Sequence, residues 1–219
     1  MASFLRLSIA DLLRDARDLY TNARDDAEVF AVLSAEPWGF TAADFDAGLA
    51  LVDTATEALK TESREGREAR RATHDYDVAV DAVRASYNRH RARLRDRIAR
   101  DDPDYAGIGL VGEAPGDRET LLKEADDFYG FLSGRSDLLA GVRGVSPEAV
   151  AEVQALIEAA RTAGSAQTRE AGEAEGAQKA QQAAVEALRR HAALTAKDAA
   201  AALADHPQLR ERLGLLERS

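Results

Sequence analysis

Glutamates at a three-residue spacing are the residues of this chain whose type and position could most directly hold a metal ion. Glu62, Glu65 and Glu68 lie at i, i+3 and i+6, and Glu170 and Glu173 repeat part of the pattern. A di-metal carboxylate site in a helical bundle also needs Glu-x-x-His on two helices, and the sequence has no such pair. Arginines interleave with these acids, so solvated ion pairs are the favoured interpretation, and no metal or other cofactor is predicted.

Three glycines, Gly107, Gly109 and Gly112, fit the G-x-G-x-x-G spacing of a dinucleotide-binding loop. That loop works between a strand and a helix N-terminus, with an acidic residue about 20 positions further on. Here an arginine-rich helical segment comes first, and the core Ile108–Leu110 recurs as Leu213–Leu215. We therefore interpret these glycines as a helix stop and a connection.

Histidine gives no catalytic pattern here. His74, His90, His191 and His206 show no i, i+4 pairing and no matched positions between the two halves of the chain. Each is therefore interpreted as a surface or packing residue. The chain has no cysteine, which excludes disulfides, thiolate ligands and a cysteine nucleophile. No Gly-x-Ser-x-Gly turn occurs either, so the sequence predicts a protein without enzymatic activity.

Arginines form the strongest local charge feature, over residues 84–100. Seven arginines and one acid, Asp96, give this segment a formal charge of +6 in a chain of −10. One hypothesis is a dock for an anion or a partner, nucleic acid included. The other is favourable positive charge at a helix C-terminus, together with solvation. The acidic balance of the whole chain argues against nucleic acid as its main partner.

The only tryptophan, Trp38, lies with Phe40 in a Pro-Trp-Gly break between two helical segments. We interpret the pair as a staple that closes one end of a bundle. The alternative is an exposed aromatic anchor for a partner. The candidate partner-binding residues are therefore Trp38, Phe40, Arg89, Arg91, Arg93, Arg95 and Arg97.

Composition and periodicity indicate long helices. Apolar residues make up 45% of the chain, mostly alanine, and aromatic residues only 5%. Ser8, Thr41 and Ser146 are predicted N-caps; the first opens a helix to about Ala35 and the second a helix to about Arg100. Small and apolar residues at a 3-4 spacing predict a heptad seam in each long helix, with a close approach of the two helices or a kink near Gly66. No alternating β-branched stretch predicts a strand.

The chain repeats itself. Leu12–Tyr20 recurs as 121–129 with five of nine positions identical, and Ala79–Arg84 recurs, similar in sequence, 105 positions later. We interpret this as two diverged copies of one helical module. The copies are predicted at 1–110 and 111–219, with a linker at about 101–117, packed as one bundle with pseudo-two-fold symmetry.

Each copy combines a helix start with a closing Leu-Gly-Leu turn, Gly39–Asp44 with Gly109–Leu110 and His206–Pro207 with Leu213–Leu215. This pattern resembles a family of bacterial helical-bundle proteins whose module is commonly present twice and ends in Arg-x-x-Leu-Gly-Leu/Ile. Arg210 fits that motif, whereas the first copy departs from it. The resemblance implies the fold and no activity.

We therefore predict an all-α, elongated helical bundle from a tandem duplication, with two long helices and shorter packed ones. The expected function is a non-enzymatic structural or protein-interaction bundle with an unknown protein partner, and self-association is a further hypothesis. The alternatives are a metal- or small-ligand-binding bundle and weak nucleic-acid association through 84–100. Residues 1–13 contain no apolar run long enough for a signal peptide or a membrane span, so a cytoplasmic location without membrane contact is expected.

Overall fold

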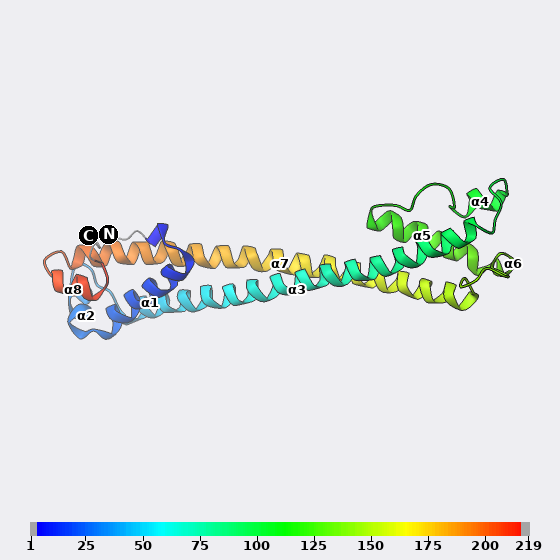
Figure 1. Cartoon of the computed structure of the whole chain (residues 1–219). Helices are drawn as coiled ribbons and strands as arrows, with labels where there is room; N and C mark the ends of the chain where they lie inside the picture. Colours follow the sequence, from blue (N-terminus) through cyan, green and yellow to red (C-terminus); the bar gives the residue numbers. More distant parts are fainter. Residues whose placement is uncertain (1–3, 216–219) are drawn as a thin grey trace. The chain divides into compact units, whose positions relative to one another are not determined.

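The computed structural model describes residues 4–215, and all regular structure in that range is helical (Figure 1). The elements are η1 (Phe4–Arg6), a 3₁₀ turn, and the α-helices α1 (Ile9–Asp25), α2 (Ala27–Ser34), α3 (Ala42–Arg95), α4 (Pro103–Gly107), α5 (Arg118–Ser133), α6 (Ser136–Leu139), α7 (Pro147–Ala202) and α8 (Pro207–Arg212). The prediction of an all-α bundle built on two long helices is confirmed.

The predicted N-caps are confirmed. Ser8 Oγ accepts a hydrogen bond from the Asp11 amide at 3.2 Å, and the Thr41 amide donates to the Asp44 carboxylate at 2.8 Å. The first helix is shorter than predicted, because Asp26 leaves helical geometry and caps α2 by accepting from the amides of Glu28 and Val29. An aspartate that satisfies the free N–H groups of a new helix ends the old one at low cost.

The two long helices run without interruption, α3 over 54 residues and α7 over 56. No kink is needed at Gly66, and a Cβ added there would meet no atom within 4 Å. No side chain therefore packs against Gly66, and the close approach of the two helices predicted there stays a prediction. The glycine of α7 that does have a close neighbour is Gly164, where an added Cβ would lie 3.1 Å from the Tyr76 ring.

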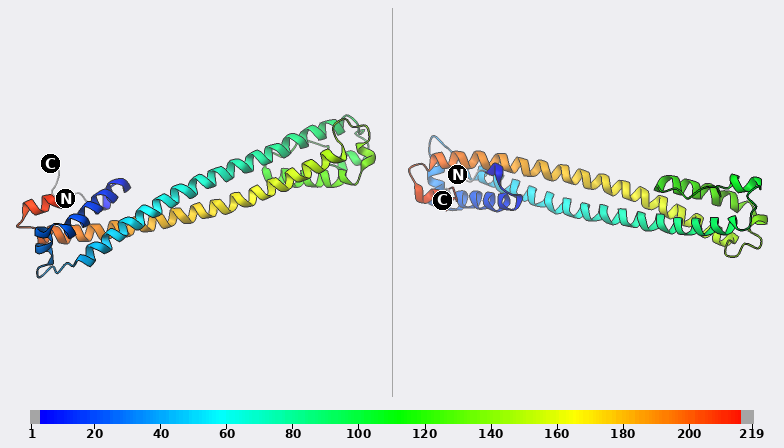
Figure 2. Two further views of the ribbon diagram at one scale, coloured as in Figure 1. Left: turned by 90° about the horizontal axis from the view of Figure 1, so that it is seen from below. Right: turned by 45° about the horizontal axis from the view of Figure 1, so that its top comes forward.

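The chain divides into two compact units, which are described separately. Unit 1 comprises 1–65 and 173–219, and unit 2 comprises 66–172. One end of α3 and one end of α7 belong to unit 1, and the other ends belong to unit 2. Because α3 lies in the first copy of the repeat and α7 in the second, each unit contains residues of both copies. Figure 2 shows α1, α2 and α8 gathered on the long helices in unit 1, and α4, α5 and α6 in unit 2.

The core of unit 1 is formed by α1, α2 and the adjoining parts of α3 and α7. The buried face of α1 consists of Leu12, Ala16, Leu19, Tyr20 and Ala23, which follow the spacing of one helix face. In α3 and α7 the buried residues of this unit include several of the predicted seam, together with others outside it such as Phe45 and Ala199. Those on the seam include Val52, Ala55, Val185, Leu188 and Ala192.

The core of unit 2 repeats this arrangement with α5 in place of α1. Every buried residue of α1 has a buried counterpart in α5 exactly 109 positions later, namely Leu121, Ala125, Phe128, Tyr129 and Leu132. The predicted linker also belongs to this core. It contains the short helix α4, and Ile108 and Leu110 beyond it are buried against α3 and α5.

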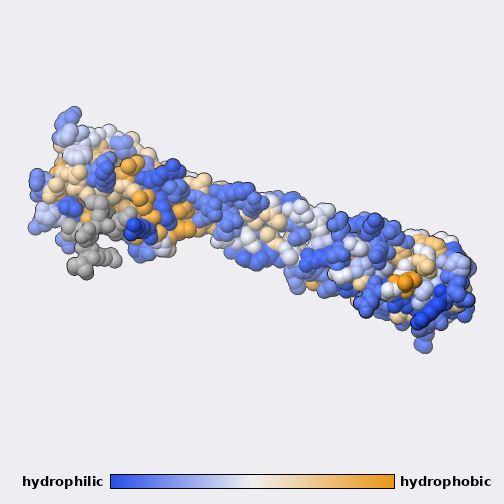
Figure 3. All heavy atoms as spheres, turned by 90° about the horizontal axis from the view of Figure 1, so that it is seen from above, coloured by the Kyte–Doolittle hydropathy of each residue, from blue (hydrophilic) through white to orange (hydrophobic). Residues whose placement is uncertain are grey.

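Most of the surface shown in Figure 3 is hydrophilic, with hydrophobic residues in smaller patches. The large apolar side chains that the described range exposes are few. They are Leu5, Trp38, Val78, Val111 and Leu194.

Candidate functional site

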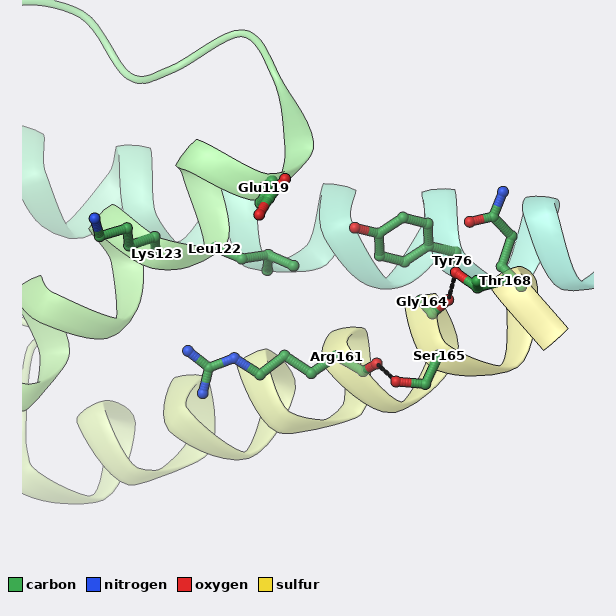
Figure 4. Close-up of a pocket in the computed structure, with 9 residues that line it drawn as sticks. Tyr76, Glu119, Leu122, Lys123, Arg161, Gly164, Ser165 and Thr168 are labelled. Carbon is green, nitrogen blue, oxygen red and sulfur yellow. Dashed lines mark hydrogen bonds between the residues drawn. The ribbon is translucent and has the colours of Figure 1, made fainter.

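A groove opens in unit 2 where α5 begins, beside the long helices. We call it the tyrosine groove; it has a cavity volume of about 450 Å³ (Figure 4). Tyr76 extends from α3 toward Leu122 and Glu119 of α5, above the small residues of α7. The tyrosine groove is lined by Tyr76, Glu119, Leu122, Lys123, Arg161, Gly164, Ser165, Gln167 and Thr168.

Tyr76 is held in place from two sides. Its ring rests on Gly164, the residue at which α7 has no side chain to obstruct it. The guanidinium of Arg118 lies 5.3 Å from the ring centroid and also forms an ion pair with Asp77. The ring is thus a fixed wall of the groove.

The main cation of the tyrosine groove is already paired. Arg161 lies 2.7 Å from the Asp126 carboxylate and 2.6 Å from that of Glu158, and these acids raise its pKa. The Ser165 hydroxyl donates to the carbonyl of Arg161 at 3.1 Å, as serine does on an ordinary helix surface. These pairings favour a packing surface over a catalytic centre.

A second groove uses another side of the same two helices and shares no residue with the first. We call it the alanine groove; it has a cavity volume of about 550 Å³. Small side chains form its floor, and Glu68, Arg71, Asp75 and Glu170 form its rim. The floor consists of Ala72, Ala159, Thr162, Ala163 and Ala166.

The glutamates considered as metal ligands lie on the long helices and have basic neighbours. Arg64 lies 2.7 Å from the Glu65 carboxylate in unit 1, and Arg169 lies 2.6 Å from that of Glu170 in unit 2. These two pairs occupy equivalent positions in the two copies. Such pairs are the ion pairing that the sequence favoured.

The arginines of the candidate partner-binding set do different things. Arg91 and Arg95 of α3 both bind the segment that follows α4. Arg91 donates to the carbonyl of Gly109 and Arg95 to that of Leu110, at 2.6 Å each. Arg93 donates to the carbonyl of Arg143, and Arg89 to the hydroxyl of Ser86. Arg97 is exposed.

The two aromatic residues of the candidate partner-binding set differ in burial. Phe40 packs against the core of unit 1 and stacks on Phe45, with ring centroids 5.5 Å apart and planes at 19°. Trp38 keeps 39% of its surface exposed. Phe40 therefore fits the predicted staple, and Trp38 keeps the exposure that an anchor would need.

Sequence reasoning missed a tyrosine–histidine pair that occurs in both units, buried in unit 2 and half-buried at the histidine in unit 1. In unit 2 the Tyr129 hydroxyl lies 3.0 Å from His90 Nδ1, and in unit 1 the Tyr20 hydroxyl lies 2.6 Å from His191 Nδ1. Burial raises the pKa of both tyrosines, that of Tyr20 to about 12. Burial, aided by the charges of Arg89 and Arg93, lowers the pKa of His90.

The two histidines are not at matched sequence positions, because His191 corresponds to Ser86 and His90 to Thr195 at the 105-residue offset. Each copy thus places one histidine and one hydroxyl residue at i and i+4 on the long helix, in opposite order. Counting hydroxyl residues together with histidines would have exposed this signal. Both pairs satisfy buried polar groups within the core.

Comparison of the chain with protein-family models, with curated proteins and with solved structures gives no match. Within residues 4–215 no helix combines the length and apolar character needed to cross a membrane.

Proposed function

We propose that this chain is a non-enzymatic protein-interaction bundle whose alanine groove receives an α-helix of a protein partner. One observation carries the proposal: the long helices are uncovered where they border this groove. No side chain is buried in residues 66–79 of α3 or 161–172 of α7. An uncovered groove between two helices is the geometry into which an amphipathic helix docks.

The floor of the groove suits a helix rather than a loop. Ala159, Ala163 and Ala166 lie along one side of α7 at helical spacing. Small side chains allow a neighbouring helix axis to approach to the lower end of the usual range, about 8 Å. A partner helix with a stripe of alanine and leucine would cover this floor.

The rim of the groove indicates the charge of the partner. The lining includes three acids, Glu68, Asp75 and Glu170, and one base, Arg71, so its formal charge is −2, although Glu170 is also paired with Arg169 outside the lining. A helix with lysine or arginine beside its apolar stripe complements this rim. The same excess of acid disfavours a second copy of this chain, because the rims would repel each other.

Fluorescence anisotropy with a labelled synthetic helix of about 20 residues, long enough to follow the groove, tests the proposal. The peptide carries alanine and leucine on one face and lysine on the flanks. We expect it to bind, and Ala163→Glu to abolish binding by placing a carboxylate on the floor. Ala180→Glu is the matched control, since Ala180 is an exposed alanine of α7 outside the groove.

Equal binding of a scrambled peptide, or of the Ala163→Glu variant, would refute docking in this groove. Light scattering supplies the other decisive outcome. If the wild-type protein is a dimer and Ala163→Glu converts it to a monomer, the groove holds a second copy, and the basic partner helix is rejected.

A further inference from the structure

The seven arginines of residues 84–100 share one property: none forms an ion pair with a carboxylate within residues 4–215. The arginines elsewhere in the chain commonly have one. Carboxylate oxygens lie within 3.2 Å of Arg14, Arg17, Arg24, Arg64, Arg118, Arg135, Arg161, Arg169 and Arg212. Acids lie near this segment, since Glu113 lines the same groove as Arg84 and the charge of Arg84 helps to lower the pKa of Asp117, but none of them pairs directly with an arginine of 84–100.

Part of this charge lines a third groove in unit 2, with a cavity volume of about 400 Å³, which we call the arginine groove. Arg84, Asn88, Arg91 and Arg95 lie at i, i+4, i+7 and i+11, on one face of α3. Glu113 and Ala114 complete the lining, and no residue is shared with the alanine groove. With three arginines and one glutamate, the formal charge of the groove is +2.

The guanidinium groups are fixed by backbone carbonyls. Arg84 donates to the carbonyls of Pro115 and Gly116, at 2.6 and 3.0 Å, and Arg91 to that of Gly109 at 2.6 Å. A carbonyl is neutral, so these bonds orient the arginines and leave their charge in place. Side chains ordered in advance lose little entropy when a ligand binds.

Unit 1 shows that the fold does not need these arginines to form the corresponding turn. Gly214 has φ +68°, close to the +71° of Gly109. The Leu215 amide donates to the Arg210 carbonyl at 3.0 Å, as the Leu110 amide does to that of Tyr105 at 3.2 Å.

Alanines stand in unit 1 where the arginine groove has its polar residues. At the 105-residue offset, Asn88, Arg91 and Arg95 correspond to Ala193, Ala196 and Ala200. Only Arg84 has an arginine counterpart, Arg189, which donates to the carbonyls of Leu5 and Leu7. In both units, then, an arginine of a long helix holds the segment that precedes a shorter helix, Arg189 before α1 and Arg84 before α5. The arginine groove is a feature of unit 2.

From these observations we infer that the arginine groove binds a phosphate group. Carbonyls occupy the Nε and Nη2 groups of Arg91 and Arg95, but the Nη1 group of each forms no hydrogen bond within residues 4–215. These Nη1 groups can donate charge-assisted hydrogen bonds to phosphate oxygens. A phosphate dianion also equals the +2 charge of the groove in magnitude. Since the phosphate could belong to a small molecule or to a polynucleotide, the test includes one probe of each kind.

The experiment measures binding of inorganic pyrophosphate by calorimetry and of a fluorescent single-stranded oligonucleotide by anisotropy, both at low salt. The deciding variant is Asn88→Glu, because Asn88 is exposed and a carboxylate there faces the bound anion without removing any arginine. We expect it to weaken binding about tenfold or more. Arg97→Gln is the control; it removes a positive charge from the same helix region outside this groove.

Loss of pyrophosphate binding in Asn88→Glu, with Arg97→Gln close to wild type, supports a site for small phosphate compounds. The same pattern with the oligonucleotide alone supports a polynucleotide as the source of the phosphate. The inference is overturned if neither probe binds, if Asn88→Glu binds as tightly as wild type, or if Arg97→Gln weakens binding as much.

Discussion

Replacing Gly48 by alanine should destabilise unit 1, although alanine is the better helix former. A Cβ at Gly48 would lie 2.4 Å from a ring carbon of Tyr20. Non-bonded carbon atoms prefer about 3.5–4.0 Å, so the ring or the helix must move by about 1 Å. Tyr20 cannot swing into solvent, because it is fully buried and its hydroxyl lies 2.6 Å from His191 Nδ1.

The size of the effect follows from two opposing terms. Overpacking a well-filled core costs about 1–3 kcal/mol, and a clash this deep belongs at the upper end. The higher helix propensity of alanine returns about 1 kcal/mol. The expected net loss in the free energy of unfolding is therefore about 2 kcal/mol. Gly66→Ala, in the same helix, meets no atom within 4 Å and should instead stabilise by up to about 1 kcal/mol.

Urea unfolding followed by Trp38 fluorescence checks the result, because Trp38 and Gly48 both lie in unit 1. Far-UV circular dichroism of the same samples also reports unfolding for Gly66→Ala. In a Tyr20→Leu background the ring is gone, so Gly48→Ala should lose its penalty. A Gly48→Ala variant as stable as wild type, or one equally destabilised in both backgrounds, would refute the steric argument.

Two further predictions concern the polar contacts. Because its pKa is lowered, folded His90 binds a proton less readily than an unfolded histidine of pKa about 6.5, so stability should fall as the pH drops from about 7.5 to 5.5. Urea unfolding should show a weaker pH dependence in His90→Gln than in the wild-type protein; equal slopes would contradict the assignment. Arg84→Leu and Arg189→Leu each remove two hydrogen bonds, one half-buried and one exposed, and at about 0.5–1.5 kcal/mol per bond each variant should lose about 1–3 kcal/mol, measured by thermal unfolding. A smaller loss at both sites than in an Arg97→Leu control would show that these bonds do not stabilise the units.

The helical elements were predictable because their signals are local. Ser8, Thr41 and Ser146 cap helices through residues within one turn, and the seam of α3 follows from spacing alone. The interruption at Asp26 was missed because the apolar pattern continues across it. A capping residue inside a periodic segment competes with helix continuation, and the sequence alone does not show which prevails.

The contacts between helices were harder to predict. The two copies keep the same kind of contact, but the two residue types that form it stand on opposite helices in one copy and the other. In unit 1 Arg17 of α1 lies 2.7 Å from Asp53 of α3, whereas in unit 2 Asp126 of α5 lies 2.7 Å from Arg161 of α7. Arg17 and Asp126 are equivalent residues of opposite charge. Position-by-position comparison counts such pairs as divergence, although the ion pair between the helices is kept. The same holds for the exchanged histidine and hydroxyl positions.

The duplication therefore provides an internal comparison that a single module would not. Where both units keep a feature, as with the arginine clamps Arg84 and Arg189 or the buried tyrosines, packing and polar satisfaction explain it. Where one unit has a feature that the other replaces by alanine, folding alone does not require it. For the turn itself Arg91 and Arg95 belong to the second group, since unit 1 forms it with Ala196 and Ala200 at the equivalent positions. Arg91 also binds the carbonyls of Val111 and Gly112, a stretch without a described counterpart in unit 1. Because the turn does not require these two arginines and no carboxylate pairs with them within residues 4–215, the arginine groove is where a function beyond folding should first be sought.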